Sequence, residues 1–192
     1  MKTRIQEILI SILFFPGAAL LPAALTFSEA SYAESFVGKP APLFTAKNQD
    51  GQEFKLESRK GQGYTVLFFY PKAGTPGCTK QACAFRDSIK VIRDQGAMVY
   101  GISADDVVAQ KKFHDEHKMT FDLISDADGK IIKMYDVKMP VVTMAKRQTF
   151  ILDSVLVVRK HFEDVDPSMD AKNVAAAITE LKAADGKKPK AK

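Results

Sequence analysis

The pattern of apolar and polar positions predicts strands and helices in regular succession. Residues 65–70 and 97–103 are almost continuously apolar, as expected for strands that are covered on both faces of a sheet. Between them, from about residue 79 to residue 95, apolar side chains recur at helical spacing, and Gly96 ends the run. A strand, a helix and a second strand in this order indicate a βαβ unit with two parallel strands.

The rest of the pattern extends this unit into a single α/β domain. Residues 43–47 and 53–56 flank a cluster of turn-forming residues and predict an N-terminal β-hairpin. The later elements are expected to be a charged helix over 104–118, a short strand over 121–125, a short helix over 130–135, strands over 147–152 and 155–161 joined by a tight turn at Asp153 and Ser154, and a last helix from near Ser168 to Ala184. This order predicts a mixed central sheet with helices on both faces.

Residues 1–33 have the pattern of an export signal. A short basic stretch precedes an apolar run over residues 8–25, and small residues around Ala33 suit a signal peptidase. A retained membrane anchor is the alternative, because the run is barely long enough to span a bilayer. Two prolines interrupt the run and favour cleavage. We therefore expect a domain over residues 34–186 that is exported, to the bacterial periplasm, without stable insertion in a membrane.

The charge of the chain is concentrated at one end. Of a net charge of +5, four positive charges come from lysines within residues 187–192, which leaves the domain almost neutral. Such a run predicts a solvated, disordered tail. No aromatic residue is interleaved with these lysines, so nucleic-acid binding is not expected.

The two cysteines of the chain, Cys78 and Cys83, lie where the first long helix begins. The positive end of the helix dipole favours the thiolate, which is the reactive form of cysteine. Two cysteines in an exported chain ordinarily suggest a permanent disulfide, and that interpretation remains open from the cysteines alone. The glycine, proline and threonine residues just before Cys78 favour a reactive pair instead.

Pro71, Thr75 and Cys78 form a Pro-x-x-x-Thr-x-x-Cys pattern that resembles the peroxidatic motif of the peroxiredoxins. With Cys83 five positions further on, the chain is similar to the subfamily called PrxQ or bacterioferritin comigratory protein. Several residue types at fixed spacing after a strand rarely arise by chance. The resemblance covers nearly all of residues 35–184 and implies a thioredoxin-like fold of the peroxiredoxin type.

The resemblance also implies a thiol-dependent peroxidase and a role for each site residue. Cys78 attacks hydrogen peroxide or an organic hydroperoxide and becomes a sulfenic acid, which Cys83 converts to an intramolecular disulfide. Thr75 and Arg147 supply hydrogen-bond donors, and Pro71 shields the site from water. A thioredoxin-like protein is the expected reductant, no cofactor or metal is implied, and we expect a monomer.

The expected helix and the expected disulfide conflict in their geometry. Five residues along a helix rise by about 7.5 Å and rotate by about 140°, whereas a disulfide needs Cα atoms within about 7 Å. The first turns of the helix must therefore unwind when Cys83 bonds to Cys78. Arg86, about 12 Å along the same helix, is interpreted as a member of a surface ion pair.

Two other functions on the same fold remain as alternatives. A copper-delivery protein would need ligands such as His114, His117, Met139 and Met144, but the histidines fall in a charged helical segment and the methionines suit packing. An exported thiol–disulfide oxidoreductase usually carries Cys-x-x-Cys, a closer spacing than the one found here. The segment between residues 135 and 147 is shorter than in many PrxQ proteins and lacks their common tryptophan. The resemblance therefore does not predict how substrates reach the site near this segment.

Overall fold

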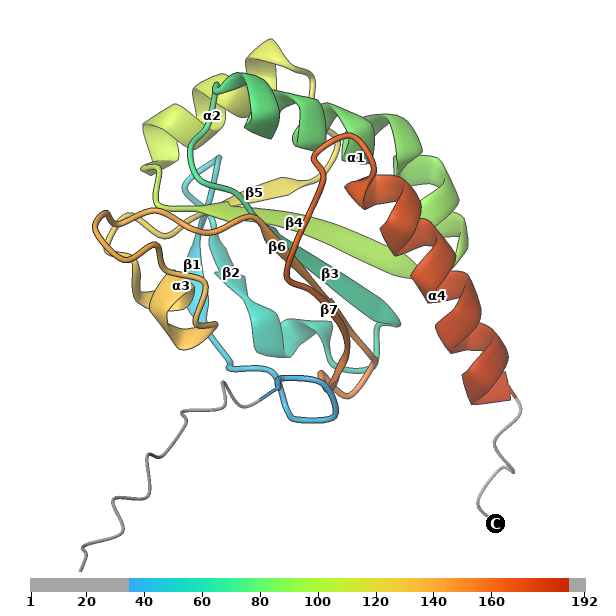
Figure 1. The fold of residues 1–192 in the computed structure, drawn as a ribbon. Coiled ribbons are helices and arrows are strands. Elements are labelled where there is room, and N and C mark those ends of the chain that lie inside the picture. The colour runs from blue at the N-terminus through green and yellow to red at the C-terminus, as the bar shows by residue number, and fades with distance from the viewer. Residues whose placement is uncertain (1–34, 187–192) are drawn as a thin grey trace, which may run out of the picture. The chain divides into compact units, whose positions relative to one another are not determined.

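The computed structural model describes residues 35–186 (Figure 1). The predicted export signal over residues 1–33 and the predicted basic tail over residues 187–192 lie outside this part of the chain. Within the described part, no helix is both long enough and apolar enough to cross a membrane.

A mixed sheet in the order β2-β1-β5-β4-β3-β6-β7 forms the centre of the domain. Its strands are β1 Thr45–Asn48, β2 Glu53–Lys55, β3 Tyr64–Phe69, β4 Ala97–Ser103, β5 Asp122–Ser125, β6 Gln148–Leu152 and β7 Val158–Phe162. The three neighbouring strands β3, β4 and β5 run parallel, and all other pairs are antiparallel. The predicted mixed sheet and N-terminal hairpin are confirmed.

Helices cover both faces of this sheet. The helices are α1 Pro76–Asp94, α2 Val107–Glu116, α3 Lys130–Met134 and α4 Asp170–Gly186, and a 3-10 helix, η1, spans Leu56–Arg59. Figure 1 shows α1, α2 and α4 on one face and α3 on the other. The handedness explains this, because two right-handed crossovers that step in the same direction along the sheet place α1 and α2 on the same side.

Two apolar cores, one on each face, hold the layers together. Under α1 and α4, the β3 side chains Val66 and Phe68 pack with Phe85 and Ile178, all fully buried. On the other face, alternate residues of the same strand, such as Leu67, join the core beneath α3. Strand β3 is buried at every position, as its continuous apolar run predicted.

Two of the element boundaries that differ from the prediction are explained by local structure. Helix α1 begins at Pro76, three residues earlier than expected. Proline suits the first position of a helix, because a backbone N–H there would have no partner within the helix. Strand β7 begins at Val158, because the turn before it comes one residue later than expected, with the amide of Leu156 donating to the Asp153 carbonyl at 2.9 Å. The carboxylate of Asp153 also accepts hydrogen bonds from the amides of Val155 and Val157 and holds this wider loop.

Candidate active site

Cys78 lies in the first turn of α1, directly after the loop that leaves the end of β3. Thr75 is the N-cap in an extended conformation, and Pro76 is the first helical residue. The amides of a first helical turn have no acceptor within the helix and favour negative charge. The Cys78 side chain is only 1% exposed and carries a free thiol. The fold therefore places a shielded sulfur at the positive end of a long helix.

Arg147, the residue just before β6, contacts the Cys78 sulfur. Strand β6 is antiparallel to β3 and pairs Gln148 with Phe69, so the residue before β6 lies beside the end of β3. The Arg147 Nη2 atom donates a hydrogen bond to Cys78 Sγ at 3.4 Å. A guanidinium is always charged and offers several donors, so it stabilises a thiolate at this place. The structure thus brings together two of the predicted site residues.

A chain of buried and partly buried hydrogen bonds fixes the position of Arg147. Its Nη1 atom donates to Gln81 Oε1 at 2.6 Å, and Gln81 Nε2 donates to Asp170 Oδ2 at 2.7 Å. The hydroxyl of Thr149 donates to the same carboxylate oxygen at 2.7 Å. Burial raises the pKa of Asp170, while bonds from Gln81 and Thr149 and the charge of Arg147 oppose the rise. The network joins α1, β6 and α4 around the sulfur.

Sequence reasoning missed Gln81, Thr149 and Asp170. Gln81 follows Cys78 by three residues and therefore shares its face of the helix, on a side where Ala82 and Phe85 are also fully buried. A polar residue on a buried face was a usable signal for Gln81. Asp170 lies 89 residues from Gln81 in sequence, and no local pattern connects the two.

A second set of hydrogen bonds holds the loop before α1. The carboxylate of Asp105 accepts from the backbone N–H of Ala73 at 2.8 Å and from the Ser103 hydroxyl at 2.6 Å. The predicted charged helix over residues 104–118 is shorter in the structure, because Asp106 caps α2 by accepting from the amide of Ala109. Asp105 is thereby left outside the helix and ties the end of β4 to the loop.

The remaining predicted site residues lie between the end of β3 and the second turn of α1, and their roles stay predictions. Thr75 donates its hydroxyl to the carbonyl of Lys72 at 3.0 Å, so it must rotate to donate to a thiolate or a peroxide. Pro71 is half-buried at the end of β3. Cys83 is a half-buried free thiol that packs against the core under α1.

Arg86 forms the surface ion pair that the sequence indicated. Its Nε atom lies 2.8 Å from Asp87 Oδ1, and its Nη1 atom donates to the carbonyl of His117 at 2.7 Å. The second bond ties α1 to the residue that ends α2. Its charge thus supports the packing of two helices, whereas the charge that contacts the Cys78 sulfur belongs to Arg147.

The candidate copper ligands do not converge. His114 points to Asp115 at 3.1 Å, and the His117 ring packs edge-on against Phe113. Met139 and Met144 lie opposite each other in a backbone-bonded hairpin. Among the described residues, no group of three or more histidine, cysteine or acidic side chains is arranged to hold a metal ion.

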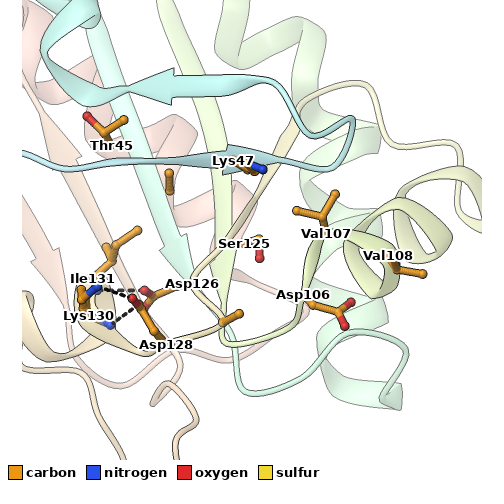
Figure 2. Close-up of a pocket in the computed structure, with 12 residues that line it drawn as sticks. Thr45, Lys47, Asp106, Val107, Val108, Ser125, Asp126, Asp128, Lys130 and Ile131 are labelled. Atoms are coloured by element: carbon orange, nitrogen blue, oxygen red, sulfur yellow. Dashed lines mark hydrogen bonds and ion pairs between the residues drawn. The ribbon is translucent and has the colours of Figure 1, made fainter.

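A surface hollow of about 540 Å³ lies at the ends of β1 and β5 and is not lined by any predicted site residue. Figure 2 shows Asp126 and Asp128 in contact with the start of α3, whereas Lys47 and Asp106 have no drawn bond to another lining residue. Asp126 accepts from the amides of Ile131 and Ile132, and Asp128 pairs with Lys130. These groups stabilise the start of α3, and neither cysteine lines the hollow.

Comparisons with known proteins agree with this geometry. Residues 37–161 match the profile of the AhpC/TSA family. A chloroplastic peroxiredoxin Q of Oryza sativa subsp. japonica is 41% identical over 145 residues, and the match covers 75% of this chain and 66% of the relative. The putative peroxiredoxin bcp of Coxiella burnetii is 38% identical over 123 residues, covering 61% of this chain and 81% of that protein.

Solved structures give the same result. Peroxidoxin BcpB of Mycobacterium tuberculosis superposes with a TM-score of 0.71 at 33% identity and covers 76% of this chain and 97% of its own. Enterococcus faecalis AhpC superposes with a TM-score of 0.74 at 16% identity, covering 82% and 99%, and bears on the fold alone. The predicted thioredoxin-like fold of the peroxiredoxin type is confirmed. Since the family profile matches residues 37–161, and the peroxiredoxin Q and bcp relatives match over most of the domain, the chain belongs to the AhpC/TSA family and to its peroxiredoxin Q and bacterioferritin comigratory protein group.

Proposed function

We propose that the protein is a thiol-dependent peroxidase in which Cys78 is the nucleophile. The Cys78 thiolate attacks one oxygen of a hydroperoxide, the S–O bond forms as the O–O bond breaks, and the other oxygen leaves as an alkoxide or hydroxide that takes up a proton. The sulfur is oxidised to a sulfenic acid and the peroxide is reduced to an alcohol or water.

The contact between Arg147 and the Cys78 sulfur is the observation that carries this proposal. A thiolate alone reacts slowly with a peroxide, and the rate depends on donors that stabilise the charge developing on the leaving oxygen. Arg147 lies 3.4 Å from the sulfur, close enough for the same guanidinium to reach a peroxide bound there. The partly buried bond to Gln81 holds the guanidinium in place before the substrate arrives.

Cys83 completes the cycle in this proposal. Its thiol attacks the Cys78 sulfenic acid, a disulfide forms between the two sulfurs, and water leaves. Because both residues lie within one continuous helix, the first turns of α1 must unwind for the bond to form. A dithiol of a thioredoxin-like protein then supplies two electrons to restore both thiols.

The substrates are hydrogen peroxide and organic hydroperoxides. The bacterioferritin comigratory protein of Xanthomonas campestris, whose solved structure addresses its alkyl peroxide reduction activity, is 26% identical to this chain and has a TM-score of 0.68. The likeness to that protein supports the same class of substrate for this chain. Neither a metal nor a cofactor takes part in the proposed cycle.

Peroxide consumption by the reduced domain, followed by stopped flow with mass spectrometry of the products, tests the proposal. Wild-type protein is expected to form a Cys78–Cys83 bridge, Cys83→Ser to stop at the sulfenic acid, and Cys78→Ser to be inert. A reduced wild-type protein that ignores peroxide but exchanges disulfides with other proteins would favour the oxidoreductase alternative instead.

We also propose that the domain is an exported monomer in the bacterial periplasm. The support for export is the sequence pattern of residues 1–33, although the rice relative is a chloroplastic protein. Expression of the full chain in a bacterium, fractionation and mass determination of the product give the test. Full-length protein in the cytoplasm, or a dimer on sizing, would contradict the respective part.

A further inference from the structure

A buried carboxylate on α4 holds the first turns of α1 from outside the helix. Asp170 is 1% exposed, and its Oδ2 atom accepts hydrogen bonds from Gln81 and Thr149, both at 2.7 Å. Gln81 and Thr149 are fully buried as well. Among the described residues, no buried side-chain nitrogen or oxygen lacks a partner. The buried polar atoms of these three side chains are therefore all hydrogen-bonded, and breaking one bond leaves a buried polar group unpaired.

Gln81 occupies the segment that must unwind during the proposed cycle. It lies between Cys78 and Cys83 in α1. In a regular helix the Cα atoms of residues five apart are separated by about 8.6 Å, from a rise of 1.5 Å per residue and a radius of 2.3 Å. A disulfide accepts at most about 6.8 Å. Bridging the two cysteines therefore displaces Gln81 from its place between Arg147 and Asp170.

We propose that Asp170 is a positioning residue that, through Gln81, keeps the first turns of α1 folded and slows disulfide formation by Cys83. This inference rests on the proposed peroxidase function. Unwinding costs the Gln81 bonds and leaves the Asp170 oxygen in a buried place with one donor fewer. Gln81 also accepts the hydrogen bond that holds Arg147 at the sulfur. Keeping Gln81 in place therefore favours peroxide reduction and delays disulfide formation by Cys83.

The delay decides between two fates of the sulfenic acid. Cys83 converts it to a disulfide with loss of water, or a second hydroperoxide oxidises it to a sulfinic acid and is itself reduced to an alcohol or water. The first fate needs an unwound helix, whereas the second needs a folded site with Arg147 in place. The strength of the Asp170 contact therefore sets the peroxide concentration at which Cys78 overoxidises.

Asp170→Ala removes the acceptor and is expected to shift this partition. At a fixed high peroxide concentration, the ratio of disulfide to sulfinic acid should rise about tenfold, which corresponds to about 1.4 kcal/mol. Asp170→Asn keeps an acceptor oxygen in the same place and should stay within about threefold of wild type. Mass spectrometry of Cys78 after one peroxide addition measures the ratio directly.

Asp185→Asn supplies the matched control, since Asp185 is a carboxylate near the other end of α4. It holds Arg159 at 2.8 Å and Tyr64 at 2.6 Å, away from Gln81. This variant loosens α4 and should lower the melting temperature without changing the ratio. Amide hydrogen exchange over residues 79–84 in the reduced protein should speed up in Asp170→Ala and stay unchanged in Asp185→Asn.

The outcomes separate this inference from the proposed function. If wild type consumes peroxide and forms the bridge, but Asp170→Ala keeps the wild-type ratio, the positioning role is wrong and the peroxidase stands. If Asp185→Asn moves the ratio equally, general loosening of α4 is the cause and the role is again wrong. Should Asp170→Ala not fold, Thr149→Val removes one donor from the same carboxylate and is expected to raise the ratio about threefold. An unchanged ratio in that variant would overturn the inference. Failure of the reduced wild-type protein to consume peroxide would refute the proposed function itself.

Discussion

Gly77→Ala should make the protein more stable and the peroxide reaction slower. Gly77 is the second residue of α1, and a Cβ atom built there would lie 3.2 Å from Arg147 Nη2. That contact is tighter than ordinary van der Waals distances, so the guanidinium must move by a few tenths of an ångström. The bond to Gln81 limits where it can go.

The two effects have opposite signs and can be estimated separately. Alanine favours a helix over glycine by about 0.5–1 kcal/mol, which for a domain of this size raises the melting temperature by about 1–4 °C. Moving the guanidinium from 3.4 Å to about 3.8 Å from the sulfur weakens their attraction by about 0.5 kcal/mol at an effective dielectric constant of about 20. Misalignment toward the peroxide adds to this, and we expect kcat/KM to fall by about twofold to tenfold.

Thermal unfolding and stopped-flow peroxide reduction on the same preparations measure both effects. Ser88→Ala is the control, because it raises helix propensity in α1 about 16 Å from Gly77. It should raise the melting temperature slightly and leave kcat/KM unchanged. A Gly77→Ala protein that is more stable and fully active would show that the rate does not depend on where Arg147 lies.

Three further predictions concern other parts of the domain. Arg147→Ala should lower kcat/KM by about 10²–10³-fold, whereas Arg86→Ala should change it less than about threefold; equal losses would refute the assignment. Asp105→Ala frees the amide of Ala73 and should slow peroxide reduction several-fold while speeding amide exchange in the loop before α1; an unchanged rate would remove Asp105 from the support of the site. Burial lowers the pKa of His161 below 6.5, against the opposing charge of Glu163. As the pH falls, the unfolded chain therefore binds a proton at this residue more readily than the folded domain does. The free energy of unfolding should therefore fall between pH 7 and pH 5, and denaturant titrations of His161→Phe should lose that part of the fall; the same slope in both proteins would contradict it.

Much of the fold could be predicted from the chain because its signals are local. The apolar run of β3 and the helical spacing of α1 each depend on neighbours within a few residues. The boundaries were less certain where a side chain decided them. Asp153 holds a loop that the sequence suggested as a tight turn, and Asp106 rather than the residue before it caps α2.

The sequence by itself determined the alternating architecture, the helix start that carries Cys78, and the group of proteins to which the chain belongs, since these depend on residue types at short, fixed spacing. Only the tertiary structure decided what supports the sulfur. The antiparallel pairing of β6 with β3 brings Arg147 to Cys78, and the packing of α4 on α1 brings Asp170 to Gln81. These pairs are 66 or more residues apart, and hydrogen bonds over such separations depend on how whole elements pack.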